Sequence, residues 1–166
     1  MNSPIIQSHI IFSLEEKDAA NLVKLERECF STGWTETQYR TLLREIARMN
    51  SIEGQLPSWQ IWGVKQHENE LAGYISLGVY FSAGELEIVN LAVRRSSRRM
   101  GMAKALLVHS LDWGRKAGCA NIILEVRESN IPAISLYTTA GFLLAGRRKG
   151  YYQNPHEDAL ILSRSL

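Results

Sequence analysis

Apolar residues in the N-terminal part of the chain recur at the spacing of amphipathic helices. Ser13 and Glu16 have the spacing of a capping box, and the apolar positions that follow fall on one helix face. Those positions are Ala19, Leu22, Val23, Leu25 and Cys29. Thr35 and Gln38 repeat the capping-box spacing, which predicts a second helix that runs through about Met49. The chain is therefore expected to open with helices that each bury one face.

The pattern then changes to that of strands. Residues 50–58 have the composition of a loop, and strands are predicted after it. They cover residues 59–65, 71–81 and 85–93, with a turn at Glu68–Glu70. The connections are too short for parallel crossovers, so these strands should form an antiparallel meander.

Helical and strand patterns alternate in the second half of the chain. A helix is predicted over residues 101–117, and a nearly continuous apolar strand, expected to be covered on both faces, follows at 121–126. Asn130 caps a further helix that stops at Gly141, and the segments FLLAG and DALILS complete the chain as strands. The predicted fold is a single α/β (α+β mixed) domain over residues 1–166, with a mixed sheet, antiparallel at its start, and helices on both faces.

Composition restricts the classes of function. The chain has 166 residues, 45% of them hydrophobic, and its 19 basic and 17 acidic residues leave a net charge of only +2. This balance does not favour a nucleic-acid-binding protein. Cys29 and Cys119 form no CxxC motif and lack metal-ligand spacing with any histidine, which indicates reduced thiols. With no leader segment and no long apolar run, the sequence predicts a soluble cytoplasmic protein without a metal site.

A basic loop precedes the helix predicted at 101–117. Four of the six residues from Arg94 to Arg99 are arginines, and small residues follow at Gly101 and Ala103. An uncovered helix N-terminus offers free N–H groups and partial positive charge to a phosphate. Neither the GxGxxG nor the GxxxxGK[ST] pattern is present. The residues alone favour a phosphate-bearing cofactor and a merely solvated loop equally. They favour a nucleic-acid contact less, because no aromatic residues interleave with the arginines.

Several segments resemble one known family. NLAVRRSSRRMGMAKALL is similar to the acetyl-CoA pyrophosphate loop of the GCN5-related N-acetyltransferases (GNAT), whose pattern [QR]xxGx[GA] falls on Arg98, Gly101 and Ala103. ILEVRESNIPAISLYTTAGF resembles the LEVRxSNxxAxxLYxxxGF block of the bacterial ribosomal-protein alanine N-acetyltransferases, and GYYQNPHEDALIL resembles their tail. CFSTGWTETQY, with Phe30 and Trp34, resembles their substrate-side loop. The resemblance implies the GNAT fold, a mixed and mostly antiparallel central sheet with helices on both faces.

The resemblance also implies acetyl-CoA as cosubstrate, without a metal, and a set of residues that bind it. Backbone groups of Leu91, Ala92 and Val93 are expected to bind the pantetheine arm in the manner of an added strand. Asn130 is expected to contact the same arm, in addition to capping its helix. The residues expected at the pyrophosphate are Arg98, Arg99, Met100, Gly101, Met102, Ala103 and Lys104.

Two residues are candidates for acid–base catalysis of acetyl transfer, which requires a neutral amine and a proton for the departing thiolate. Glu125 interrupts an apolar strand, and the residues alone allow either a buried base or a strand-end carboxylate paired with Arg127 or solvent. Tyr137 is by itself either a proton donor or a core tyrosine at helical spacing. The matched LEVR and LY motifs imply the general base at Glu125 and the general acid at Tyr137.

The sequence therefore predicts an enzyme that moves acetyl from acetyl-CoA to a protein N-terminal amine by direct attack. The resemblance implies an N-terminal alanine of a small-subunit ribosomal protein as substrate, with no direct contact to nucleic acid or membrane. Trp34, Tyr151 and Tyr152 either line the peptide site or serve in ordinary packing. Acetylation of a lysine or a small amine is the alternative function, and a catalytically silent acyl-CoA-binding module is a weaker one. Residues 44–59 form a longer stretch than is usual for the subfamily, which bears on the substrate side.

Overall fold

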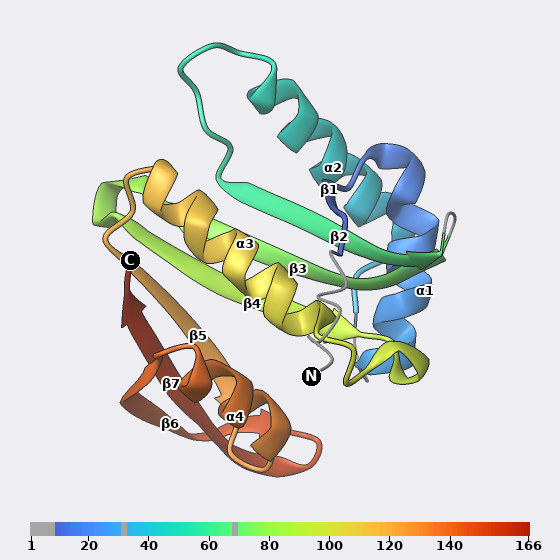
Figure 1. The fold of residues 1–166 in the computed structure, drawn as a ribbon. Coiled ribbons are helices and arrows are strands. Elements are labelled where there is room, and N and C mark those ends of the chain that lie inside the picture. The colour runs from blue at the N-terminus through green and yellow to red at the C-terminus, as the bar shows by residue number, and fades with distance from the viewer. Residues whose placement is uncertain (1–8, 31–32, 68–69) are drawn as a thin grey trace, which may run out of the picture.

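The computed structural model describes residues 9–30, 33–67 and 70–166. Within these ranges the chain forms a mixed sheet with the strand order β1-β2-β3-β4-β5-β7-β6 and helices on both faces (Figure 1). The strands are β1 (Ile11–Ser13), β2 (Trp59–His67), β3 (Glu70–Tyr80), β4 (Glu85–Val93), β5 (Asn121–Arg127), β6 (Leu143–Gln153) and β7 (His156–Ser165). The α-helices are α1 (Ala19–Cys29), α2 (Glu36–Asn50), α3 (Met102–Lys116) and α4 (Ile131–Thr139). The predicted mixed architecture is confirmed.

The sheet consists of two antiparallel units. Strands β1 to β4 form the predicted meander, and β5, β7 and β6 form the second unit. The units meet where β4 runs parallel to β5, from the pair Glu85↔Asn121 to the pair Ile88↔Leu124. Helix α3 connects these parallel neighbours, which need a crossover rather than a hairpin. Of the predicted turn at Glu68–Glu70, residues 68 and 69 lie outside the described residues, and Glu70 begins β3.

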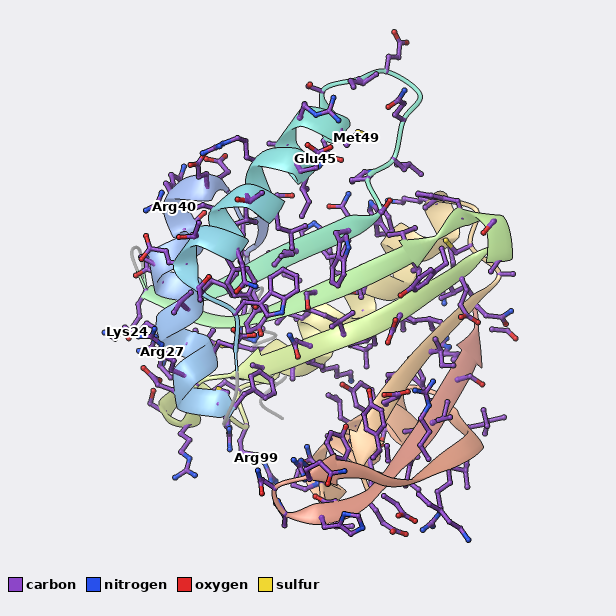
Figure 2. The ribbon with its side chains drawn as sticks, turned by 180° about the vertical axis from the view of Figure 1, so that it is seen from behind. Lys24, Arg27, Arg40, Glu45, Met49 and Arg99 are labelled. Carbon is purple, nitrogen blue, oxygen red and sulfur yellow. The ribbon has the colours of Figure 1, made fainter. Side chains whose placement is uncertain are left out.

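Helices on the two faces of the sheet build two apolar clusters. Helices α1 and α2 pack against β2 to β4, where Leu22, Leu43 and Tyr74 are buried. Helices α3 and α4 pack on the other face, where Leu107 and Tyr137 are buried. Figure 1 shows α3 in front of the sheet, and Figure 2, drawn from behind, shows α1 and α2 on the opposite side. Each fully buried leucine contributes about 1.5–3 kcal/mol of transfer free energy, so this packing fixes both layers.

The start of the first helix differs from its prediction. Ser13 is the last residue of β1 and not a helix cap. A 3-10 turn follows at Glu16–Asp18, in which the Glu15 backbone N–H donates to Asp18 Oδ2 at 2.9 Å. Strand β1 was missed because it spans three residues, too few for an alternating pattern. The second predicted cap is confirmed, because Thr35 Oγ1 accepts a hydrogen bond from the Gln38 N–H at 3.3 Å.

Strand β5 is covered on one face only, which corrects the expectation of burial on both. Ile122, Leu124 and Val126 are buried in the α3/α4 cluster, whereas Ile123 and Glu125 on the other face are half-buried. The reason is the placement of α1 and α2, whose cluster contains residues of β2, β3 and β4. The second face of β5 is therefore open at Glu125.

Two further features concern the cysteines and the helices. Cys29 is half-buried and Cys119 is buried, and both are free thiols. Across the described ranges, no helix combines the length and the apolar character needed to cross a lipid bilayer.

Gly114 allows α3 to lie close to the sheet. A Cβ at this position would lie 2.5 Å from Cδ1 of Leu86 on β4 and 2.8 Å from Cδ1 of Leu166. Leu86 is fully buried, so its side chain has little room to move. The close approach of α3 to β4 therefore depends on the absence of a side chain at Gly114.

We expect Gly114→Ala to lower the free energy of unfolding by about 1–3 kcal/mol through overpacking, although alanine is about 1 kcal/mol better than glycine in a helix. Thermal denaturation followed by circular dichroism measures the change. Lys116→Ala, at an exposed position of the same helix, is the control and should stay within about 0.5 kcal/mol of wild type. A stabilised Gly114→Ala variant would show that the helix does not need this close approach.

Candidate functional site

The sheet divides at the end of the parallel pairing between β4 and β5. The last pair is Ile88↔Leu124. Beyond it β4 stays paired to β3 through Val93↔Gly73, and β5 stays paired to β7 through Arg127↔Ala159. β4 also carries an extra residue between Ile88 and Asn90, opposite the step from Ser76 to Leu77 on β3. Bulges bend a strand and increase its twist, which moves β4 away from β5.

The end of β4 presents main-chain groups at this split. The Arg94 N–H donates to Ala72 O on the β3 side at 2.8 Å. Because main-chain groups alternate along a strand, those of Ala92 also face β3, whereas those of Leu91 and Val93 face the split. Among the three residues expected to bind pantetheine, Leu91 and Val93 therefore have backbone groups there, and Ala92 does not. The Val93 O already accepts a hydrogen bond from Arg98, which leaves the Val93 N–H for a ligand.

The loop after β4 has the geometry of an anion-binding site. Arg99 and Gly101 both have positive φ values, 65° and 81°. Positive and negative φ values thus alternate along this loop, and such alternation turns successive backbone N–H groups toward one concavity. The Ala105 N–H donates to Gly101 O at 2.9 Å, as the first intrahelical bond of α3. The N–H groups of Met102, Ala103 and Lys104 precede that bond, so they have no helical partner and can bind an anion.

Two of the loop arginines make contacts within the protein. Arg98 Nε donates to Val93 O at 3.1 Å, although the side chain is largely exposed. Arg94 forms ion pairs with Glu70 at 2.9 Å and Glu28 at 3.4 Å. Arg99, by contrast, is exposed, and Figure 2 places it at the end of the molecule where β4 diverges from the β5–β7 unit.

His9 lies against the same loop, and sequence reasoning did not single it out. Its Nε2 lies 2.6 Å from Met100 O. A Cβ at Gly101 would also lie 3.5 Å from this nitrogen. The two partners are 91 positions apart in the chain, and no local motif around His9 indicates the contact.

Glu125 is the first residue of β5 beyond the pairing with β4. Its side chain lies on the face opposite Leu124 and is 17% exposed. Arg148 Nε on β6 lies 2.9 Å from Glu125 Oε1. The expected alternative, pairing of Glu125 with Arg127, is wrong, because Arg127 pairs with Glu157 at 2.6 Å. Glu125 thus stands at the split with a cation on one oxygen.

Tyrosines gather around Glu125. The rings of Tyr151 and Tyr152 are 5.1 Å apart, in an edge-to-face arrangement. The Glu125 carboxylate, chiefly through hydrogen bonding, raises the pKa of Tyr151, while burial and the charge of Glu125 raise the pKa of Tyr152. Tyr137 lies on α4, beneath the other face of the sheet, and is 6% exposed. Burial, with a contribution from Tyr152, raises the pKa of Tyr137 as well.

Asn130 performs the structural role predicted for it. Its Oδ1 accepts a hydrogen bond from the Ala133 N–H at 3.3 Å and caps α4. Only Glu128 and Ser129 separate the end of β5 at Arg127 from this cap, so α4 begins soon after β5. Among the described residues, the Asn130 amide nitrogen takes no part in this cap.

Trp34 belongs to a separate group on the α1/α2 side. Its ring centroid lies 5.4 Å from that of Tyr39 and 6.0 Å from that of Trp59. The side chain is 41% exposed. Phe30 follows the end of α1 and is 37% exposed. The middle of the predicted substrate loop, residues 31 and 32, lies outside the described residues.

Glu26 connects this group to the sheet, and sequence reasoning missed it. It is 3% exposed and accepts hydrogen bonds from Tyr39, Tyr74 and the Trp34 N–H. It lies among charged residues in the segment KLERE, a composition typical of an exposed helix face. A signal was nevertheless present, because Glu26 lies four residues after Leu22 and so falls on the apolar face of the helix.

Comparisons with known proteins agree with this geometry. Residues 19–142 match the model of the Acetyltransferase (GNAT) family. A Bacillus subtilis protein provisionally named [ribosomal protein bS18]-alanine N-acetyltransferase is 27% identical over 146 residues, which is 88% of each chain. The [ribosomal protein bS18]-alanine N-acetyltransferase of Escherichia coli is 42% identical over 81 residues, or 48% of this chain and 55% of that protein.

The fold is shared over nearly the whole length. The crystal structure of the ribosomal-protein-S18-alanine N-acetyltransferase from Escherichia coli superimposes with a TM-score of 0.77 at 29% identity, covering 95% of this chain and 94% of that one. The family match spans β4, the loop that follows it, β5 and α4. The chain therefore belongs to the acetyltransferase (GNAT) family, and it is an acetyl-CoA-dependent N-acetyltransferase.

Proposed function

We propose that the protein acetylates the N-terminal α-amine of a protein, with the N-terminal alanine of a small-subunit ribosomal protein as substrate. The observation that carries this proposal is the position of Glu125 on β5, directly beyond the last pair with β4. Tyr137 lies on α4, in the apolar cluster on the opposite face of the sheet. An amine can approach from the open face of β5, while the thioester lies between the strands. The names of the Bacillus subtilis and Escherichia coli relatives support the ribosomal substrate.

The proposed acetyl-CoA site has three parts. The free N–H groups at the start of α3 bind the pyrophosphate, and Arg99 adds charge beside them. The main-chain groups of Leu91 and Val93 pair with the amides of the pantetheine arm, as an added strand would. Asn130 contacts the same arm with its amide nitrogen. No step in this binding requires a metal ion.

Glu125 is the proposed general base. A protein α-amine titrates at about 7.7–8, so a carboxylate can deprotonate it directly or through one water. Arg148 occupies one carboxylate oxygen and fixes the orientation of the group. As the amine nitrogen forms its bond to the acetyl carbon, its proton passes to Glu125. Tyr151 and Tyr152, beside Glu125, and Trp34, across the substrate side, are proposed to line the peptide path.

Tyr137 is the proposed general acid. When the carbon–sulfur bond breaks, the electron pair leaves with sulfur, and the Tyr137 phenol donates its proton to the thiolate. Burial raises the pKa of Tyr137, so the phenol is protonated throughout the neutral range. Burial in the same site also disfavours the thiolate and therefore raises the pKa of the thiol. The pKa of the thiol thus moves toward that of the Tyr137 phenol.

The function is tested with two peptides and acetyl-CoA, followed by mass spectrometry. One peptide begins with a free alanine and lacks lysine, and the other has a blocked N-terminus and one internal lysine. We expect acetylation of the first peptide only. Modification of the second alone would transfer the proposal to lysine acetylation, and modification of neither, with acetyl-CoA bound, would favour a small-molecule amine.

The catalytic roles are tested by Glu125→Gln and Tyr137→Phe. Each should lower kcat by about 10²–10⁴-fold, the usual contribution of general acid–base catalysis. Glu128→Gln is the matched control, because Glu128 pairs with Arg147 on the surface and should leave kcat within about twofold of wild type. Equal rates for Glu125→Gln and this control would exclude Glu125 as the base.

The pH profile of kcat/KM should rise through about pH 8 as the substrate amine deprotonates. The raised pKa of Tyr137 means that its proton is lost only above the ordinary tyrosine value of about 10. Activity should therefore form a plateau up to about pH 10, provided that the protein stays folded. A decrease in kcat/KM near pH 8 to 9 that disappears in Tyr137→Phe would contradict the raised pKa of the Tyr137 phenol.

The proposed role of the loop before α3 in binding the pyrophosphate is tested by Gly101→Ala. Calorimetry gives the dissociation constant of CoA for this variant. The substitution adds a Cβ at φ 81° where a phosphate would approach, and we expect affinity to fall about tenfold, or about 1.4 kcal/mol. Gly118→Ala adds the same strain at φ 77° at the other end of α3, in open space. The control should lose stability comparably and keep the affinity for CoA.

A further inference from the structure

A buried carboxylate outside the proposed catalytic group organises the substrate side. Glu26, on α1, is 3% exposed. Its Oε1 accepts hydrogen bonds from the hydroxyls of Tyr39 at 2.7 Å and Tyr74 at 2.9 Å, and from Asn90 Nδ2 at 3.4 Å. Its Oε2 accepts the Trp34 backbone N–H at 3.0 Å. These donors come from four separate places: α2, β3, β4 and the loop between α1 and α2.

The donors to Glu26 in the described part of the chain are neutral groups. The cations on the same helix, Lys24 and Arg27, are exposed, and Figure 2 shows both on the outer side of α1. A buried carboxylate without a cation is costly unless its oxygens are fully hydrogen-bonded. Apolar residues often stabilise such positions better. The arrangement is therefore better explained by the groups that Glu26 orients than by its own contribution to stability.

Asn90 is one of these oriented groups. It follows the bulge of β4, two positions beyond Ile88, the last residue paired with β5. Its side chain lies on the α1/α2 face with Ala92, which is also the face of β5 that carries Glu125. A carboxylate only accepts hydrogen bonds, so the Asn90 NH₂ group must point toward Glu26. The Asn90 carbonyl oxygen is the atom left for a ligand.

The loop between α1 and α2 is the second oriented group. The hydrogen bond from the Trp34 N–H holds its backbone against Glu26. A Cβ at Gly33 would lie 2.6 Å from Glu26 Oε2, so residues 33 and 34 pack directly on the carboxylate. The Trp34 ring then lies beside Tyr39 and Trp59, partly open to solvent. Glu26 thus sets the distance between this aromatic group and the strand that carries Asn90.

We propose that Glu26 is a positioning residue for the amine substrate: it holds the Trp34 loop and fixes Asn90 so that the Asn90 carbonyl oxygen accepts a hydrogen bond from the incoming amine. The inference rests on the proposed function for the identity of the amine as a peptide N-terminus. Asn90 and Glu125 then flank the amine across the split. Burial and the Glu26 carboxylate raise the pKa of Tyr39 and Tyr74, so both hydroxyls remain donors over the whole assay range.

Glu26→Gln tests the proposal with no change in size. The amide can keep one acceptor for the tyrosines, but its NH₂ group then faces the Trp34 N–H, donor against donor. We expect KM for the alanine peptide to rise about tenfold and kcat to change less than about threefold, with the dissociation constant of CoA unchanged. Glu45→Gln is the control, because Glu45 pairs with Arg48 on the exposed face of α2 (Figure 2). An unchanged peptide KM in Glu26→Gln, or a parallel loss of CoA affinity, would overturn the proposal.

A double-mutant cycle with Asn90→Ala separates positioning from general loosening. If Glu26 acts through Asn90, the two substitutions together should raise KM by clearly less than the product of their separate effects. Independent effects that multiply would show that Glu26 does not act through Asn90. Thermal unfolding of each variant identifies changes that come from stability alone.

Hydrogen exchange keeps this test distinct from the test of the proposed function. The Trp34 amide should exchange slowly in wild type and faster in Glu26→Gln, whichever amine is the substrate. If wild type acetylates the lysine peptide instead, the proposed function fails, and the same KM ratio is measured with that peptide. If wild type acetylates neither peptide, unchanged exchange at Trp34 overturns the inference, and faster exchange confined to residues 33–39 supports it.

Discussion

The separation of β4 from β5 is the constraint on which the rest of the site depends. Their parallel pairing ends at Ile88↔Leu124, and beyond this point each strand is held by its own antiparallel neighbour. Main-chain groups left without partners inside a sheet cost about 1–3 kcal/mol each when they are buried. A ligand with amide groups of its own, such as the pantetheine arm of CoA, can satisfy them. The break in the sheet therefore leaves an edge that is suited to such a ligand.

Packing on both faces keeps the split open. On one face α3, α4 and β5 share an apolar cluster that includes Leu107, Leu124 and Tyr137. On the other face α1 and α2 cover only the meander, so Glu125 on β5 is left accessible. The β6–β7 hairpin supplies Arg148 beside that carboxylate. Each half of the sheet thus contributes different chemistry. The meander offers main-chain groups at the end of β4 and leads into the loop before α3, and the C-terminal unit offers the proposed base.

Local signals made the helices, apart from the start of the first one, and the meander predictable from sequence. The Thr35 cap, the small residues after Arg99 and the Asn130 cap each act within a few positions of the chain. The contacts that could not be predicted join distant segments. His9 meets Met100 across 91 positions, and Asn90 meets Glu26 across 64. The charge pattern also allowed a wrong ion pair at Arg127. Its partner is Glu157, 30 positions away, and not the nearby Glu125.

The two inward-facing carboxylates show how environment assigns different roles to one functional group. Glu125 is partly exposed, has one cationic partner and stands where two strands part, so water and an amine can reach it. Glu26 is closed off, and its hydrogen bonds in the described part of the chain come from neutral donors on four segments. A carboxylate that exchanges protons needs access, whereas one that orients amide and hydroxyl donors needs exclusion of water. The sequence places a glutamate at both positions, and only the arrangement of β4, β5 and α1 distinguishes the group suited to chemistry from the group suited to holding the substrate side in place.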